Sequence, residues 1–152
     1  MSYLFINPVS EINISYHPKI PINKRAKVAS SSDAYNYFLE VFDPSVMNIK
    51  EEAAVLYLNR GGRVVGVYKL SSGGITGTVV DIRLILGIAL KSLTCGIILA
   101  HTHPSGELNP SKADIELTQR LKEAAKIMEI SLLDHLILST EAFYSFADEG
   151  CI

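Results

Sequence analysis

Two histidines and an aspartate near the middle of the chain have the types and spacing of metal ligands. His101 and His103 are separated by one residue, and Asp114 follows in a segment that Ser111 is predicted to open as a helix. Residues i and i+2 at the end of an extended segment point to the same side, so both imidazoles can face one ion. Two neutral imidazoles and one carboxylate suit Zn²⁺, and three protein ligands leave a fourth position for water. The spacing therefore predicts a catalytic zinc site.

Each part of this pattern has a simpler explanation when it is taken alone. A His-x-His pair in a loop is usually polar surface, and Ser111-x-x-Asp114 is equally a helix capping box. Their combination, with the histidines at a strand exit and the carboxylate on the next helix, favours metal binding.

A zinc-activated water needs a group that accepts its proton and returns it to the leaving group. The candidate carboxylates are Glu51, Glu52, Glu107 and Asp134. Glu51 and Glu52 precede a predicted core strand, where a period of two lets one face the site and the other face solvent. The pattern alone does not choose between them. His135, beside Asp134, is either a partner of a metal ligand or a buried structural histidine, and we favour the structural role.

Helical and strand patterns alternate along the chain and would position these residues. The predicted helices cover residues 33–42, with Ser31 or Ser32 as the cap and Pro44 as the end, residues 83–93, with a capping box from Thr78 to Asp81, and a segment from Ser111 onward. The predicted strands cover 53–59 and 63–70, which form a hairpin, and 95–100, 130–138 and 142–147, with a break at 71–74. Helices and strands thus share one mixed α/β core.

Composition favours one compact domain inside the cytoplasm. The chain has 152 residues, of which 48% are hydrophobic, and this allows a sizeable core without disulfide or metal staples. Its two cysteines have no partner at metal or redox spacing, and its start lacks the features of a signal peptide. The long apolar region 79–100 carries three charged residues, so we expect a core segment and no membrane span. We expect residues 1–30 to be an irregular lead-in and 31–152 to be the domain.

The sequence resembles a known superfamily, the JAB/MPN (JAMM) metalloproteases. Their motif is a glutamate followed further along the chain by H-x-H-P-x(6)-S-x-x-D. His101, His103, Pro104, Ser111 and Asp114 match that motif without a gap. Within the superfamily, HTHPSGELNPSKAD, LLDHLIL and FYSFADEG resemble the RadC family, historically labelled DNA repair proteins. The likeness runs from about residue 31 to the C-terminus. The sequence has no counterpart of the N-terminal helix-hairpin-helix segment of longer RadC proteins, the part most easily tied to DNA binding.

The resemblance implies a fold and a role for each site residue. The fold would be a deaminase-like three-layer α/β/α sandwich with a central mixed sheet. His101, His103 and Asp114 would bind zinc, and Ser111 would help to stabilise the oxyanion. The RadC pattern places an acidic residue four positions before the Val-Leu of the strand, which implies Glu51 as the general acid and base, with Glu52 in reserve.

The leading functional hypothesis is a zinc-dependent hydrolase, a metallopeptidase or isopeptidase with a peptide or protein substrate. One alternative is a catalytically idle scaffold for protein or DNA partners, although such forms generally lose ligand positions and this chain keeps all three. Another is a DNA-repair-associated protein, which the net charge of −2 argues against despite a modest basic cluster at Lys19, Lys24, Arg25 and Lys27. A nucleobase deaminase would need H-x-E and P-C-x-x-C, which are absent. Exposed strand edges would permit a homodimer.

Overall fold

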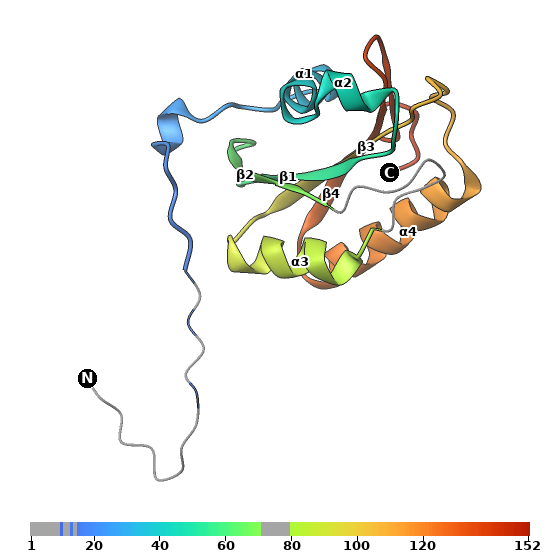
Figure 1. Cartoon of the computed structure of the whole chain (residues 1–152). Helices are drawn as coiled ribbons and strands as arrows, with labels where there is room; N and C mark the ends of the chain where they lie inside the picture. Colours follow the sequence, from blue (N-terminus) through green and yellow to red (C-terminus); the bar gives the residue numbers. More distant parts are fainter. Residues whose placement is uncertain (1–9, 11–12, 14, 71–79) are drawn as a thin grey trace.

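A five-stranded mixed sheet forms the centre of the structure, a computed structural model that describes residues 10, 13, 15–70 and 80–152 (Figure 1). The strands are β1 (Ala53–Leu58), β2 (Val64–Lys69), β3 (Gly96–Thr102), β4 (Ser131–Leu138) and β5 (Phe143–Ser145). Their order across the sheet is β2-β1-β3-β4-β5. Strands β3 and β4 are parallel, whereas the other neighbouring pairs are antiparallel.

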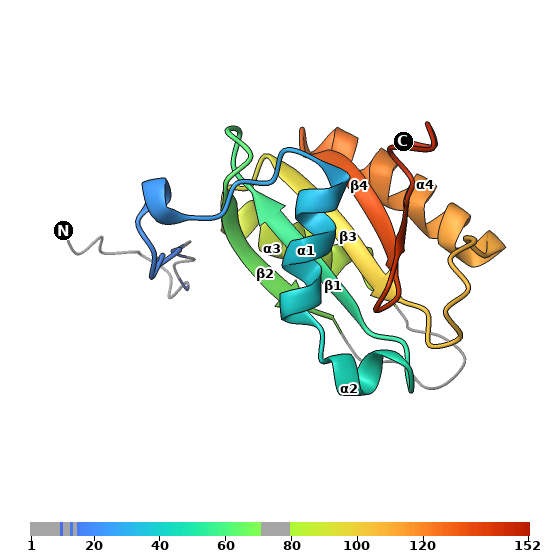
Figure 2. The ribbon, with the colours of Figure 1, turned by 90° about the horizontal axis from the view of Figure 1, so that it is seen from above.

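Helices cover both faces of this sheet. The helices α1 (Ser31–Val41) and α2 (Pro44–Met47) lie on one face, and α3 (Ile82–Lys91) and α4 (Lys112–Ile127) lie on the other (Figures 1 and 2). A short 3-10 helix, Ile22–Lys24, precedes α1. The predicted three-layer α/β/α sandwich with a central mixed sheet is confirmed.

Strand β1 shows how the two faces are divided. Its six residues are all buried, and they alternate between two apolar clusters. The cluster beneath α3 and α4 contains Ala53, Val55 and Tyr57, and the cluster beneath α1 and α2 contains Ala54, Leu56 and Leu58. A sheet covered on both faces needs apolar residues at every position, which explains the continuous apolar run of the sequence.

The first helix begins and ends earlier than the sequence pattern predicted. The predicted caps, Ser31 and Ser32, are wrong, because Ser30 accepts from the backbone N–H of Asp33 and the Asp33 carboxylate accepts from Ser30 in a capping box. Helix α1 ends at Val41 with Phe42 as its C-cap, so Pro44 lies beyond the end of this helix. Pro44 occupies the first turn of the short helix α2, where its fixed φ and missing N–H are tolerated.

Other predicted boundaries differ by a few residues. Strand β3 extends through Thr102, so His101 lies inside the strand, and β5 is shorter than predicted. Helix α3 begins at Ile82, with Asp81 as its N-cap accepting from the N–H of Arg83. The predicted break at 71–74 and the predicted capping role of Thr78 lie outside the described residues.

In the hairpin between β1 and β2, the Asn59 side chain accepts from the N–H groups of Gly61 and Arg63. Gly62 has φ +75°, a conformation that suits glycine. These features confirm the hairpin that the sequence predicted.

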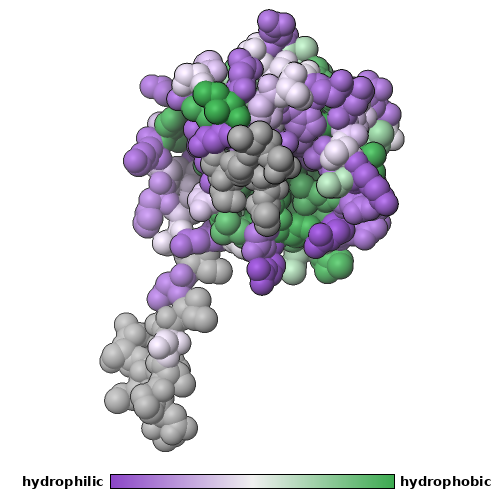
Figure 3. Space-filling model, turned by 45° about the vertical axis from the view of Figure 1, so that its right-hand side comes forward, coloured by the Kyte–Doolittle hydropathy of each residue, from purple (hydrophilic) through white to green (hydrophobic). Residues whose placement is uncertain are grey.

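The surface is mixed in character. Hydrophilic side chains cover much of the face in Figure 3, with smaller groups of apolar side chains among them. Among the described residues, none of the helices combines the length and the apolar character needed to cross a bilayer.

The capping box of α1 gives a test of this part of the fold. Replacing Ser30 by Ala should lower the free energy of unfolding by about 1 kcal/mol, because an amide of the first turn loses its acceptor. Urea denaturation of the two proteins measures the difference. The matched control is Ser32→Ala, on an exposed first-turn residue, for which we expect a change within about 0.5 kcal/mol. Equal effects of the two substitutions would contradict the cap at Ser30.

Candidate metal centre

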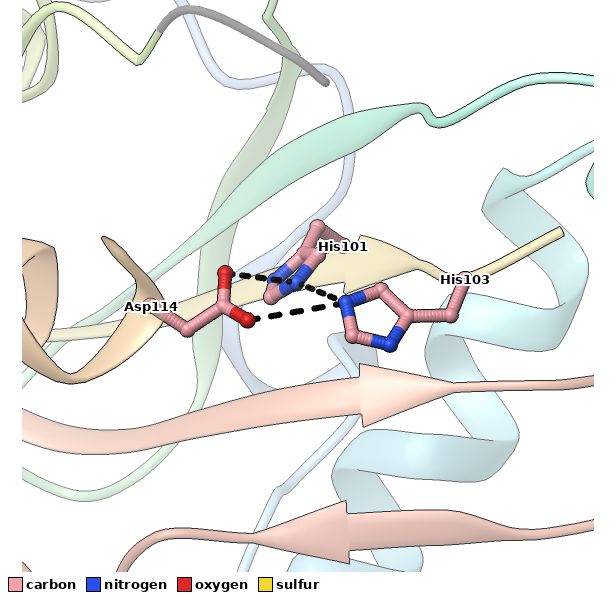
Figure 4. Close-up of side chains that lie close together, drawn as sticks. All are labelled: His101, His103 and Asp114. Atoms are coloured by element: carbon pink, nitrogen blue, oxygen red, sulfur yellow. Dashed lines mark hydrogen bonds and ion pairs between the residues drawn. The ribbon is translucent and has the colours of Figure 1, made fainter. Parts of the chain in front are cut away.

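Three elements bring the two histidines and the aspartate together at one end of the sheet. His101 is the penultimate residue of β3, and His103 follows directly after that strand. The intervening turn leads to Ser111, the N-cap of α4, and Asp114 lies in the first turn of that helix. Figure 4 shows the Asp114 carboxylate facing both rings. The end of β3, the turn after it and the start of α4 therefore bring the three side chains close together.

The distances are those of a group that can share one ion. Nε2 of His101 lies 2.9 Å from Nε2 of His103 and 3.1 Å from Oδ1 of Asp114. Nε2 of His103 lies 3.6 Å from Oδ2 of Asp114. The candidate ligand atoms of the three residues all lie within 4.8 Å of one another. His101 is buried, whereas His103 and Asp114 are partly exposed, so the group opens toward solvent on one side.

The two oxygens of Asp114 do different work. Oδ2 accepts from the backbone N–H of Ser111 and from its hydroxyl, both at 2.7 Å. The Ser111 hydroxyl oxygen in turn accepts from the backbone N–H of Asp114 at 3.1 Å. The capping box therefore fixes the carboxylate while Oδ1 faces His101. Capping and metal binding, which the sequence presented as competing explanations, are compatible in this geometry.

Local electrostatics favour an ionised carboxylate. Burial acts to raise the pKa of Asp114. Hydrogen bonds from His101 and His103, the charge of His101 and the hydrogen bond from the Ser111 hydroxyl outweigh this effect and hold the pKa well below its usual range. The hydrogen bond to Asp114 raises the pKa of His103, against the effect of burial, and the Glu107 carbonyl and the charge of Glu51 act in the same direction. The group thus carries a negative centre that attracts a cation.

The orientation of His103 indicates which of its nitrogens is available. Its Nδ1 lies against the backbone carbonyl of Glu107, and a carbonyl can only accept. Nδ1 therefore carries a proton, and in the neutral form of the ring Nε2 would hold a lone pair directed at His101. A lone pair at 2.9 Å from a second imidazole nitrogen needs a proton or a cation near it. The nitrogen-rich donor set fits a transition metal ion better than Mg²⁺ or Ca²⁺.

The two glutamates before β1 lie at different places relative to this group. Thr102 donates from its N–H to the Glu52 carbonyl and accepts at Oγ1 from the Glu52 N–H, so the pairing of β1 with β3 continues beyond Ala53. Period-two alternation then assigns Glu51 to the face of Ala53 and His101, and Glu52 to the opposite face. The charge of Glu51 acts on His103, which agrees with this assignment. Oε2 of Glu52 is buried and has no hydrogen-bond partner among the described residues.

The other two candidate carboxylates have structural partners. The exposed Glu107 side chain accepts from the N–H and the side-chain amide of Asn109, and it is the Glu107 carbonyl that contacts His103. Asp134 is buried, and it accepts from the N–H groups of His135 and Ala147 and from the hydroxyl of Ser145. It therefore ties β4 to the C-terminal segment.

Two further residues adjoin the group. His135 is fully buried on β4, and its Nε2 lies 2.8 Å from Nδ1 of His101. Its Nδ1 lies 2.6 Å from the hydroxyl of Thr118, which donates to the Asp114 carbonyl. His135 is buried, as the structural interpretation expected, and it also contacts a candidate ligand, so the two interpretations are compatible. The sequence did not mark Thr118, although it lies one helical turn after Asp114.

Together, the fold and this group define an α/β domain with a candidate metal centre at the end of its central sheet. A family model described as the RadC-like JAB domain matches residues 28–151. The chain therefore belongs to the RadC-like JAB domain family, as the sequence motifs had indicated.

Individual relatives support the same assignment. A UPF0758 protein of Flavobacterium johnsoniae is 44% identical over 130 residues, covering 85% of this chain and 55% of that protein. A UPF0758 protein of Porphyromonas gingivalis is 40% identical over 137 residues, covering 89% and 59%. The UPF0758 protein YfjY of Escherichia coli is 40% identical over 103 residues, covering 68% and 64%. The chain thus spans between 55% and 64% of the length of these relatives.

Metal binding can be measured through protein stability. Zn²⁺ at about 100 times its Kd should raise the free energy of unfolding by about 2.7 kcal/mol, because only the folded chain presents the assembled group. Mg²⁺ at the same concentration should have a much smaller effect, since it prefers oxygen ligands. Asp114→Asn, which keeps a capping side chain but removes the charge, should lose most of the gain with Zn²⁺.

The matched control is Glu116→Gln, an exposed residue on the same helix, which should leave the effect of Zn²⁺ unchanged. Thermal unfolding with and without each ion gives the comparison. A Zn²⁺ effect of equal size in Asp114→Asn would show that the ion binds elsewhere.

Proposed function

We propose that this chain is a zinc-dependent hydrolase of amide bonds, a metallopeptidase or isopeptidase acting on a peptide or protein. The observation that carries the proposal is the convergence of His101, His103 and Asp114 within 4.8 Å at a partly open end of the sheet. Membership of the RadC-like JAB domain family supports it.

The ligand chemistry supports zinc among the possible ions. Two imidazole nitrogens and one carboxylate oxygen form a three-ligand set of the kind found in catalytic zinc sites, which keep a further position open. Zinc supplies Lewis acidity, polarising a carbonyl and lowering the pKa of water to about 7. His101, His103 and Asp114 would hold the ion, with the Asp114 carboxylate already ionised and Nε2 of His103 already directed inward.

Glu51 is the residue that we propose as the general acid and base. Its carboxylate would accept a proton from the attacking water and return it to the departing amine nitrogen. Strand alternation assigns Glu51 to the face that carries His101, whereas Glu52 belongs to the opposite face. This contrast supports the choice that the sequence pattern left open.

Ser111 is the proposed partner of the developing oxyanion. Its hydroxyl now donates to Oδ2 of Asp114, so it would have to redirect that proton toward a substrate oxygen. The backbone N–H of Ser111 also donates to Oδ2 and would hold the carboxylate in place during such a change. A donor of this kind is typically worth about 3 kcal/mol of transition-state stabilisation.

Two observations argue against the rival functions, an idle scaffold and a nucleic-acid-binding protein. An idle scaffold would tolerate the loss of a ligand, whereas this chain presents a complete and assembled set. A nucleic-acid function would require a positive surface, and the net charge of −2 supplies no general one.

Replacing Glu51 by Gln tests the proposed base. Turnover should fall by about 100-fold or more, because the glutamine side-chain amide cannot accept the proton from water. Zinc binding should stay unchanged. Cleavage of a peptide library and of lysine-linked isopeptides, with the zinc-loaded protein and with added chelator, measures activity. Zinc content is determined for the same samples.

Glu52→Gln is the matched control, since it removes the neighbouring charge on the other face. It should retain wild-type turnover. Normal cleavage by the Glu51 variant would show that Glu51 is not the base. If the zinc-loaded wild-type protein cleaves none of the substrates, the scaffold function is favoured.

Replacing Ser111 by Ala tests the oxyanion role. At saturating zinc, kcat should fall by about 100-fold, because the developing charge loses a donor. Steady-state kinetics are compared with those of Ser111→Thr, which keeps both the hydroxyl and the cap, and of Ser30→Ala, which removes a cap from α1. Both should retain most of kcat. An unchanged kcat in Ser111→Ala would limit Ser111 to its capping role.

A further inference from the structure

A closed chain of polar contacts connects one candidate ligand to another through two buried residues. His101 Nδ1 lies 2.8 Å from His135 Nε2, and His135 Nδ1 lies 2.6 Å from the hydroxyl oxygen of Thr118. That hydroxyl lies 2.6 Å from the backbone carbonyl of Asp114, whose carboxylate faces His101 again. The contacts link β3, β4 and α4 behind the candidate metal centre.

The protons of this chain can be counted. Three contacts need three protons, and the available ones are the Thr118 hydroxyl proton and one N–H on each neutral imidazole. The Asp114 carbonyl has no proton, so Thr118 must donate to it. Thr118 then accepts from Nδ1–H of His135, and the bare Nε2 of His135 accepts from Nδ1–H of His101. No other assignment of neutral rings places one proton in each contact.

This order has a consequence for the metal centre. When Nδ1 of His101 carries the proton, its Nε2 holds the lone pair, and Nε2 is the atom that faces His103 and Asp114. We propose that Thr118 and His135 are positioning residues that set the tautomer of His101 and so keep its Nε2 free for a metal ion. This inference rests on the proposed zinc site and adds two residues to it.

Thr118 is required because an imidazole cannot set the direction by itself. A metal-binding histidine usually donates its second N–H to a carboxylate or a carbonyl, and both of these only accept. His135 can either donate or accept at Nε2, so its own tautomer must be fixed by its next partner. The carbonyl of Asp114 fixes it through Thr118, and the direction of every hydrogen bond in the chain follows from that single acceptor.

The surroundings of His135 favour a neutral ring held in one plane. The side chain is fully buried, and burial without a carboxylate partner disfavours an imidazolium. Phe146 stacks on the ring with centroids 4.8 Å apart and planes 5° from parallel, and its backbone N–H donates to the His135 carbonyl. A charged His135 would donate from both nitrogens, which would put the His101 proton on Nε2 and close the metal position.

The tautomers can be read directly in the metal-free wild-type protein. Long-range ¹H–¹⁵N correlation spectra of the ¹⁵N-histidine-labelled chain distinguish Nδ1–H from Nε2–H. We expect His135 to be the neutral Nδ1–H tautomer and Nδ1 of His101 to carry a proton at neutral pH. A proton on Nε2 of His135, or a His101 whose Nδ1 carries no proton, would overturn the inference. The measurement needs no variant, so it decides the matter whatever the substitutions do to folding.

Variants of Thr118 test the consequence for metal affinity. Thr118→Val keeps the branched shape but removes the hydroxyl, so His135 should shift toward Nε2–H and the Kd for Zn²⁺ should rise by roughly 10- to 100-fold. Thr118→Ser keeps the hydroxyl and should retain both the tautomers and the affinity. Competition with a chromophoric chelator measures the Kd. An unchanged Kd in Thr118→Val would overturn the inference.

The matched control is Thr94→Val. Thr94 is a buried threonine beyond the opposite end of β3, where its hydroxyl lies 2.8 Å from that of Ser92. Its loss should change neither the tautomers nor the Kd for Zn²⁺. Failure of the proposed hydrolase would appear as an inactive zinc-loaded protein with the Nδ1–H order intact, whereas failure of this inference would appear in the spectra of the metal-free chain.

Discussion

Nε2 atoms of two imidazoles face each other at 2.9 Å, next to an ionised carboxylate, and this arrangement constrains the rest of the site. Neutral rings hold such a separation only when a proton or a cation lies between or beside them. The fold supplies the arrangement by ending a buried strand and starting a helix at the same edge of the sheet. Each ring has a second contact on its other nitrogen: the Glu107 carbonyl of the same turn for His103, and His135 on β4 for His101.

Local patterns predicted the parts of this site that depend on nearby residues. The two histidines share a side because they are two positions apart, and Asp114 meets Ser111 because a capping box has a fixed spacing. The covered sheet was predictable for a similar reason, since β1 is a continuous apolar run and β3 is apolar up to Ala100. Helix starts were less predictable, because three consecutive serines, at positions 30, 31 and 32, are all acceptable caps and only backbone geometry selects Ser30.

Contacts that depend on strand register could not be read from the sequence. His135 reaches His101 because the parallel pairing of β3 and β4 places Leu99 opposite His135, and nothing near either histidine specifies that offset. Likewise, two adjacent glutamates look alike until Ala53 is paired with His101, after which alternation separates them. The role of Thr118 could not be predicted for two reasons. Its contact with His135 depends on how α4 packs against β4, and a threonine in a helix does not by itself indicate a site residue.

The double use of Asp114 explains how the site can be rigid without extra structure. Its Oδ2 completes the cap of α4, its backbone carbonyl receives the Thr118 hydroxyl, and its Oδ1 remains directed at His101. One residue therefore fixes the start of the helix, the direction of the buried hydrogen bonds and one candidate ligand atom. The helix cap and the hydrogen-bond chain orient the carboxylate and both rings through protein contacts alone. Binding then needs little reordering of side chains, which is the condition under which a small, partly open site can hold a metal tightly.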